Sequence, residues 1–175
     1  MKLKTFWQEF FLRARHAALA PLGVIRGDTR PVGRLYAVRI RPDGTREDLG
    51  LISTKLVTTA GVNWTAGLFV GTNTATAKYH QSGTGTTAPT IGDTALQTAV
   101  TTVATGTLTA ATNVATTVGT ISYGTTYAIT EWGLFTAVGG SGTGTLIDRA
   151  TFAAINVLSG DSIQFTFTLT FPTGG

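Results

Sequence analysis

The sequence has 175 residues, of which 42% are hydrophobic and 13% are charged, and its formal net charge is +4. This length suits a single domain with its own core, while the charged fraction is about half of the ~25% that soluble proteins average. The chain has no cysteine and no run of about 18 apolar residues, which excludes a disulfide framework, a cysteine metal site and a membrane-spanning helix.

The charge is distributed unevenly along the chain. Residues 1–55 contain 11 basic and 5 acidic residues, a net charge of +6, whereas residues 56–175 contain 2 basic and 4 acidic residues, a net charge of −2. Threonine and glycine replace charged residues in the second part, and they favour strands and turns respectively. The sequence therefore predicts a basic N-terminal region attached to a nearly uncharged β-rich body.

Residues 3–20 have the spacing of an amphipathic helix, which Pro21 ends. Apolar side chains recur three and four residues apart, while charged residues such as Lys4 and Glu9 lie mostly off their stripe. The stripe consists of Leu3, Phe6, Trp7, Phe10, Phe11, Ala14 and Ala18.

Four aromatic side chains on one helical stripe need a surface to pack on. The helix can cover the chain's own β domain, dock on a neighbouring subunit as an arm, or lie on a membrane surface. We expect the arm, with partner contacts made by Leu3, Phe6, Trp7, Phe10, Phe11, Arg13, Arg26, Arg30 and Arg34.

Residues 24–33 have the composition of a linker, so we expect a helix and basic arm over residues 1–33 and a β domain over residues 34–175. The arginines that begin in this linker continue into the first strand as Arg39 and Arg41. Such a stretch can contact nucleic acid, but few aromatic residues are interleaved with it and no known nucleic-acid module surrounds it. We therefore expect it to bind a protein surface and not nucleic acid.

The β domain is predicted to open with a hairpin. Residues 35–41 form a strand with Tyr36, Val38 and Ile40 on one face, and the turn residues 42–45 follow. A returning strand runs to Val57.

The middle of the chain is less regular. Residues 58–69 form a loop or a short helix that brings Trp64, Leu68 and Phe69 inward, and residues 76–80 form a short strand. A long polar loop over residues 82–94 follows.

The last third predicts a series of strands separated by turns. The expected strands cover residues 98–108, 113–123, 127–137 and 146–158, with a glycine-rich turn at 139–144. In the final strand Phe165, Phe167, Leu169 and Phe171 alternate with polar residues, which is typical of a strand with one buried face. About eight strands with a turn every ~8–14 residues favour an all-β fold, an antiparallel β-sandwich or jelly roll.

Residues with catalytic potential are few. His80 lies two residues before Ser82, but no nucleophile elbow surrounds that serine, and we expect both side chains to form hydrogen bonds in a turn. The glycines of 139–144 lack the lysine of a phosphate-binding loop. We expect Glu131 or Asp148 to pair with Arg149 or to contact a neighbouring subunit, although a glycosidase carboxylate pair is an alternative. We predict no catalytic residue, no metal site and no cofactor.

Four segments resemble small bacteriophage virion structural proteins. They are residues 56–62, residues 79–89 continuing to 96, residues 129–135 (Ile-Thr-Glu-Trp-Gly-Leu-Phe) and residues 158–165 (Leu-Ser-Gly-Asp-Ser-Ile-Gln-Phe). The resemblance covers roughly residues 50–172 and leaves the N-terminal helix outside it. It implies a subunit on the head, as decoration (cement) protein, or in the tail and its fibres, and it supplies no catalytic residues.

From this resemblance and the residues together we expect a non-enzymatic virion protein made in the host cytoplasm. Its expected partners are the major capsid protein or other virion subunits, and we expect a homo-oligomer, with a trimer as one form. The leading expectation is a capsid decoration subunit. The alternatives are a tail, baseplate or fibre component and a carbohydrate-binding module that uses Trp64, Trp132 or loop tyrosines.

Overall fold

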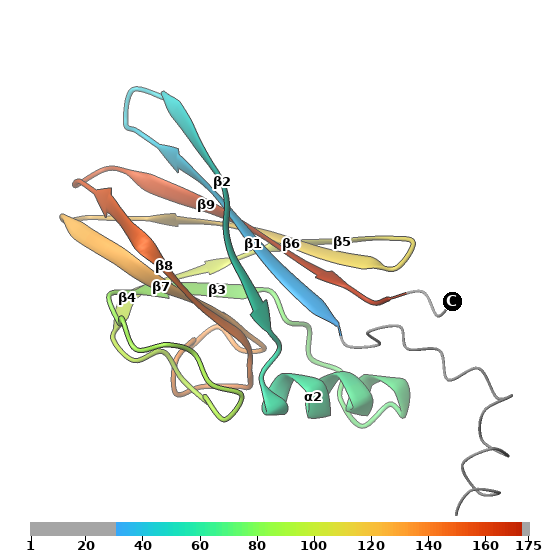
Figure 1. The fold of residues 1–175 in the computed structure, drawn as a ribbon. Coiled ribbons are helices and arrows are strands. Elements are labelled where there is room, and N and C mark those ends of the chain that lie inside the picture. Colours follow the sequence, from blue (N-terminus) through green and yellow to red (C-terminus); the bar gives the residue numbers. More distant parts are fainter. Residues whose placement is uncertain (1–30, 173–175) are drawn as a thin grey trace, which may run out of the picture. The chain divides into compact units, whose positions relative to one another are not determined.

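The computed structural model describes residues 31–172, which form two antiparallel β-sheets packed face to face with one short helix at an end (Figure 1). One sheet has five strands in the order β2-β1-β9-β6-β5, and the other has four in the order β4-β3-β7-β8. The elements are β1 (Val32–Ile40), β2 (Arg46–Leu56), α2 (Thr59–Phe69), β3 (Tyr79–Gly83), β4 (Ala99–Thr105), β5 (Thr107–Ala111), β6 (Val114–Ser122), β7 (Tyr127–Phe135), β8 (Leu146–Val157) and β9 (Ser162–Thr170). The predicted all-β sandwich is confirmed at this level, and the predicted helix over residues 3–20 lies outside the described residues.

The first hairpin is confirmed, but its first strand starts earlier than expected. Val32 and Gly33, which the sequence placed in the linker, pair with Thr170 and Leu169 as the first residues of β1. At the turn, the Asp43 carboxylate accepts a hydrogen bond from the Thr45 amide at 2.8 Å, and Gly44 has a positive φ of 84°. A short polar side chain and a glycine therefore make the reversal, as the sequence predicted.

The run over residues 98–108, expected to be one strand, is divided between the two sheets. β4 is the edge of the four-stranded sheet, β5 is the edge of the five-stranded sheet, and only Gly106 separates them. A Cβ atom on Gly106 would stand 2.6 Å from Thr117 Oγ1 and 2.7 Å from His80 Nε2. The chain can thus change sheets here only because this residue has no side chain.

The core lies between the sheets and follows the predicted alternation of β9. Ile163, Phe165, Phe167 and Leu169 all point inward and are buried. Trp132 of β7 faces them from the other sheet, with ring centroids 5.4 Å from Phe167 and 6.2 Å from Phe165. These aromatic contacts join the two layers near the middle of the sandwich.

Residues 58–69, for which the sequence allowed either a loop or a short helix, form α2 and its N-cap. The Thr58 hydroxyl caps it by accepting from the Gly61 amide at 2.9 Å, and it also donates to the Leu146 carbonyl at 2.6 Å. The expectation that Leu68 and Phe69 point inward is wrong, because their side chains are 41% and 85% exposed. Only Trp64 of the three is half-buried.

Candidate functional site

The residues predicted to bind a partner lie mostly beyond the part of the chain that the structure describes. Leu3, Phe6, Trp7, Phe10, Phe11, Arg13, Arg26 and Arg30 are all outside residues 31–172. Arg34 is described, and it is exposed on β1 between its register partners Thr54 and Thr168.

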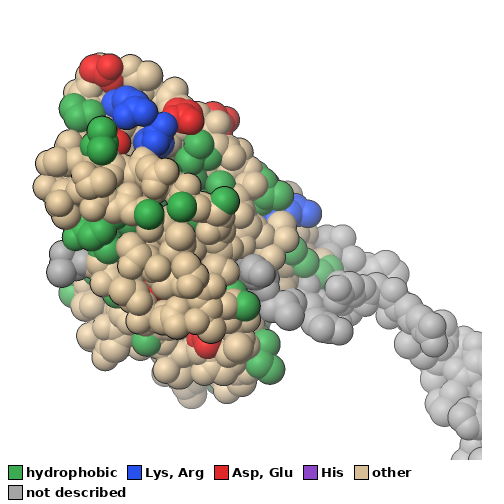
Figure 2. All heavy atoms as spheres, turned by 60° about the vertical axis from the view of Figure 1, so that its left-hand side comes forward, with side chains coloured by type: hydrophobic (Ala, Val, Ile, Leu, Met, Phe, Trp, Pro, Cys, Tyr) green, Lys and Arg blue, Asp and Glu red, His purple; other side chains and the backbone are tan. Residues whose placement is uncertain are grey.

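The arginines that continue the basic stretch into the hairpin are matched by acidic neighbours. Arg39 is ion-paired with Glu47 across β1 and β2, and it also donates to the Asn156 carbonyl at 2.7 Å. Arg41 lies 3.8 Å from the Asp161 carboxylate. Figure 2 shows the resulting mixture of blue and red side chains at one end of the molecule, above a largely tan and green surface. The hairpin therefore carries positive and negative charges side by side and is not a purely basic patch.

His80 lies in strand β3 and is fully buried between the sheets, so its expected place in a turn is wrong. Its Nδ1 accepts a hydrogen bond from Trp132 Nε1 at 3.2 Å, which leaves Nε2 as the donor to the Thr117 hydroxyl at 2.9 Å. Burial lowers the pKa of His80 to about 4. A neutral imidazole that links β3, β6 and β7 is a structural element of the core.

Ser82 also belongs to β3 and not to a turn. Its hydroxyl is 2.9 Å from the Tyr123 hydroxyl, and both side chains are buried. Burial raises the pKa of Tyr123, against the smaller opposing effect of the Ser82 hydrogen bond. Ser82 is thus hydrogen-bonded to a neutral phenol, whereas the imidazole of His80 binds Thr117 and Trp132.

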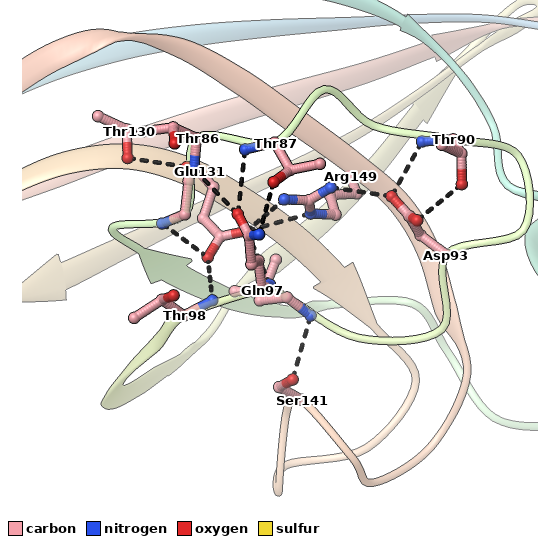
Figure 3. Close-up of polar contacts among 12 residues, drawn as sticks. Thr86, Thr87, Thr90, Asp93, Gln97, Thr98, Thr130, Glu131, Ser141 and Arg149 are labelled. Carbon is pink, nitrogen blue, oxygen red and sulfur yellow. Dashed lines mark hydrogen bonds and ion pairs between the residues drawn. The ribbon is translucent and has the colours of Figure 1, made fainter.

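Glu131 is the centre of a buried polar network on the outer face of the four-stranded sheet (Figure 3). Its carboxylate accepts from the backbone amides of Gly85, Gln97 and Thr98 at 3.0, 3.0 and 2.6 Å. The Arg149 guanidinium donates to the same carboxylate through Nε and Nη2 at 3.1 and 2.8 Å. The predicted pairing of Glu131 with Arg149 is confirmed, and five hydrogen bonds satisfy this buried charge.

Asp93 extends the network to the far end of the loop between β3 and β4. Arg149 Nη1 donates to its carboxylate at 2.9 Å, and the Thr90 amide donates at 3.0 Å. Burial acts to raise the pKa of Asp93, but hydrogen bonds from Thr90 and Arg149 outweigh it, so the pKa is lowered. We define the covering loop as residues 84–98; Glu131, Arg149 and Asp93 together hold it against β7 and β8.

The polar groups that could do chemistry are therefore engaged in holding the fold. Glu131, Arg149 and His80 are at most 3% exposed. Within residues 31–172 no group of three or more histidine, cysteine or acidic residues could hold a metal ion. The helix of the described part is neither long nor apolar enough to cross a membrane.

An apolar groove lies at the end of the sandwich beside α2. We define this as the α2 groove; its volume is about 290 Å³. Trp64 and Leu68 of α2 line one side, and Leu108, Leu169 and Phe171 line the other. No charged residue lines it. The shape and chemistry suit an apolar occupant.

The sequence analysis did not find this groove. Its walls come from α2, the segment 74–77 and the strands β5 to β9, and the strand pairing that joins these parts is not visible in the sequence. The signal that the sequence offered was the run of apolar residues 68–70 at the end of α2. A globular domain either buries such a run or uses it as a binding surface.

No family model, curated protein or solved structure matches this chain. The resemblance to phage virion proteins therefore stays a prediction, and the function has to be argued from the residues and the geometry.

Proposed function

We propose that this chain is a bacteriophage virion structural protein without enzymatic activity, and that it serves as a capsid decoration subunit. Its N-terminal arm binds neighbouring subunits, with the major capsid protein as the first partner, and its β domain packs in many copies on the particle. The proposal includes the jelly-roll character of the sandwich, because jelly rolls build viral capsid domains.

The observation that carries the proposal is the separation of charge along the chain. The basic residues gather in the first 55 positions, while residues 56–175 contain only 6 charged residues. Of these six, Glu131, Asp148, Arg149 and Asp161 are buried in the domain. A neutral surface of threonine and glycine suits close packing among many copies, since little unpaired charge is desolvated.

The aromatic arm supplies the adhesion in this proposal. If four aromatic side chains each bury about 150 Å², the gain at ~25 cal/mol per Å² is on the order of 15 kcal/mol before ordering costs. Ordering the arm and losing subunit freedom remove much of this. The remainder is enough for a subunit to stay bound to a particle.

The absence of enzymatic activity is supported by the way reactive groups are used. His80 is neutral and hydrogen-bonded on both ring nitrogens, and Glu131 accepts five hydrogen bonds. Neither side chain can reach a substrate without unfolding its surroundings.

The tail, baseplate or fibre role is the alternative that shares the same arm. Copy number separates the two, because head decoration needs far more copies than a tail ring. A carbohydrate-binding role is disfavoured, since Trp132 is fully buried and cannot stack on a sugar.

The test is quantitative mass spectrometry of purified particles, followed by deletion of residues 1–22. We expect head-level stoichiometry for the full chain and loss of particle association for the truncated chain, with unchanged thermal unfolding. A matched pair of variants tests the aromatic stripe itself. Phe10→Ser should weaken association of the chain with particles, whereas Gln8→Ser, at a position off the stripe, should leave it unchanged. Normal binding by the truncated chain would refute the arm, and absence of the chain from particles would refute the virion role.

A further inference from the structure

The α2 groove has an apolar lining that includes two exposed leucines. Leu68 and Leu108 stand on opposite sides of it and are 41% and 44% exposed. The indole Nε1–H of Trp64 is buried and has no acceptor among residues 31–172. Because this nitrogen is itself buried, an occupant of the groove contacts the apolar ring of Trp64 and the neighbouring leucines.

The described chain begins at the same end of the sandwich as the groove. Val32, the first residue of β1, pairs with Thr170, and the next residue along β9, Phe171, lines the groove. Eleven residues, 21–31, lie between this point and the end of the predicted helix at residue 20. Fully extended, they span about 35 Å, which is enough to reach the same groove on an adjacent copy.

The sequence contains one segment whose chemistry matches the groove. Residues 3–11 carry Phe6, Trp7, Phe10 and Phe11 on a single predicted stripe. Aromatic rings fill an apolar groove without desolvating charge. Recognition of an amphipathic segment by an apolar groove is a recurrent binding mode.

We propose that the α2 groove of one copy binds residues 3–11 of a second copy of this chain. The aromatic side chains lie between α2 and the β5–β6 edge, against the ring of Trp64 and the side chains of Leu68 and Leu108. This inference rests on the proposed function, because it gives the arm a receiving surface on its neighbour. A contact between two different surfaces repeats from copy to copy, which builds rings or arrays.

The test uses the absence of native cysteine in the full chain. A copy with Phe10→Cys is mixed with a copy with Leu108→Cys under mild oxidation. We expect about tenfold more mixed disulfide dimer than for Phe10→Cys with Leu158→Cys, because docking raises the local concentration of the two thiols. Leu158 is the matched control, since it is 55% exposed but lies at the opposite end, in the turn before β9.

A second pair of variants asks whether the groove itself is required. Ala115 lines the groove on β6, whereas Thr120 is exposed further along the same strand. Ala115→Arg in the Leu108→Cys copy should remove the excess of mixed dimer, and Thr120→Arg should retain it. Thermal unfolding of both variants reports whether they fold.

Each other outcome overturns the proposal. Equal cross-linking to position 158 means random collision, and insensitivity to Ala115→Arg means contact outside the groove. A double variant, Phe10→Cys with Leu108→Cys, that closes only within single chains means that the segment occupies its own groove. If cross-linking fails while deletion of residues 1–22 still removes the chain from particles, this inference fails and the proposed function stands.

Discussion

The two faces of the four-stranded sheet are held in different ways. Its inner face packs on the five-stranded sheet through apolar side chains such as Trp132 and Leu134. Its outer face is covered by the loop 84–98, which is rich in threonine, is held by hydrogen bonds to Glu131 and packs one buried leucine, Leu96, on the sheet. Adjacent residues of β7 thus serve opposite faces. A loop with little apolar surface to bury can still cover a sheet when a buried carboxylate binds its backbone.

The largest loss of stability is expected when the Glu131 carboxylate is removed from the outer face of the sheet. Glu131→Ala leaves the Arg149 guanidinium 3% exposed with only Asp93 as a charged partner, so we expect a loss of about 3–5 kcal/mol in the free energy of unfolding. Chemical denaturation measures this loss. Proteolysis should cut the loop 84–98 first, since its amide donors no longer have an acceptor.

A double variant tests how far the charges of Glu131 and Arg149 depend on each other. Glu131→Leu with Arg149→Met removes both charges together and should cost less than the sum of the two single variants. Additive losses would show that the two charges do not stabilise each other in the folded chain.

The inner face of the four-stranded sheet contains His80, which makes the stability of the fold depend on pH. Its pKa of about 4 lies below the ordinary 6.5, so between these values the unfolded chain binds a proton that the folded chain does not. Stability from this residue is complete above about pH 6.5 and falls by about 3 kcal/mol as the pH drops to 4. Denaturation at several pH values should show a shallower acid decline for His80→Gln; an unchanged slope would contradict it.

Close packing around the same histidine gives an intermediate effect. A Cβ atom on Gly119 would stand 2.6 Å from the His80 ring, whereas one on Gly124 would meet nothing within 4 Å. Gly119→Ala should therefore cost about 1–3 kcal/mol, and Gly124→Ala should stay within about 0.5 kcal/mol of the wild type. Thermal unfolding of the pair provides the measurement, and equal losses would show that the ring can move aside.

The smallest effect is expected at the rim of the network. Asp93 is 21% exposed at its side chain, so Asp93→Asn should cost about 1 kcal/mol or less. Because the folded pKa of Asp93 is lowered, its contribution is present above the ordinary value of 3.8 and is lost as the pH falls through the folded pKa. The difference between wild type and variant should vanish in strong acid; a difference that persists would show that charge is not its cause.

The local sequence pattern was sufficient to predict most strands and turns of the fold. The clean alternation in β9 and the turn at Asp43–Gly44 each identified an element, because one face of a strand is buried and tight turns need particular residues. The Glu131–Arg149 pair was also predictable, since charges within a neutral strand need a partner.

What the pattern missed depends on contacts between distant parts. Gly106 divides a continuous Val/Thr run, and its role appears only when Thr117 and His80 are seen to approach it. His80 and Ser82 looked like turn residues because their partners, Thr117 and Tyr123, follow 37 and 41 positions later. The α2 groove is assembled from seven separate segments and leaves no local signature.

The sheet change at Gly106 has a mechanical consequence. Because β4 and β5 are covalently continuous through one residue, the two layers are tethered along that side, where the Gly106 amide also donates to the Lys78 carbonyl at 2.6 Å. Residues 123–126 and residues 158–161 also join one layer to the other, and Gly106 is the shortest of these connections. A force that pulls the two layers apart would therefore be transmitted most directly through the main chain at Gly106.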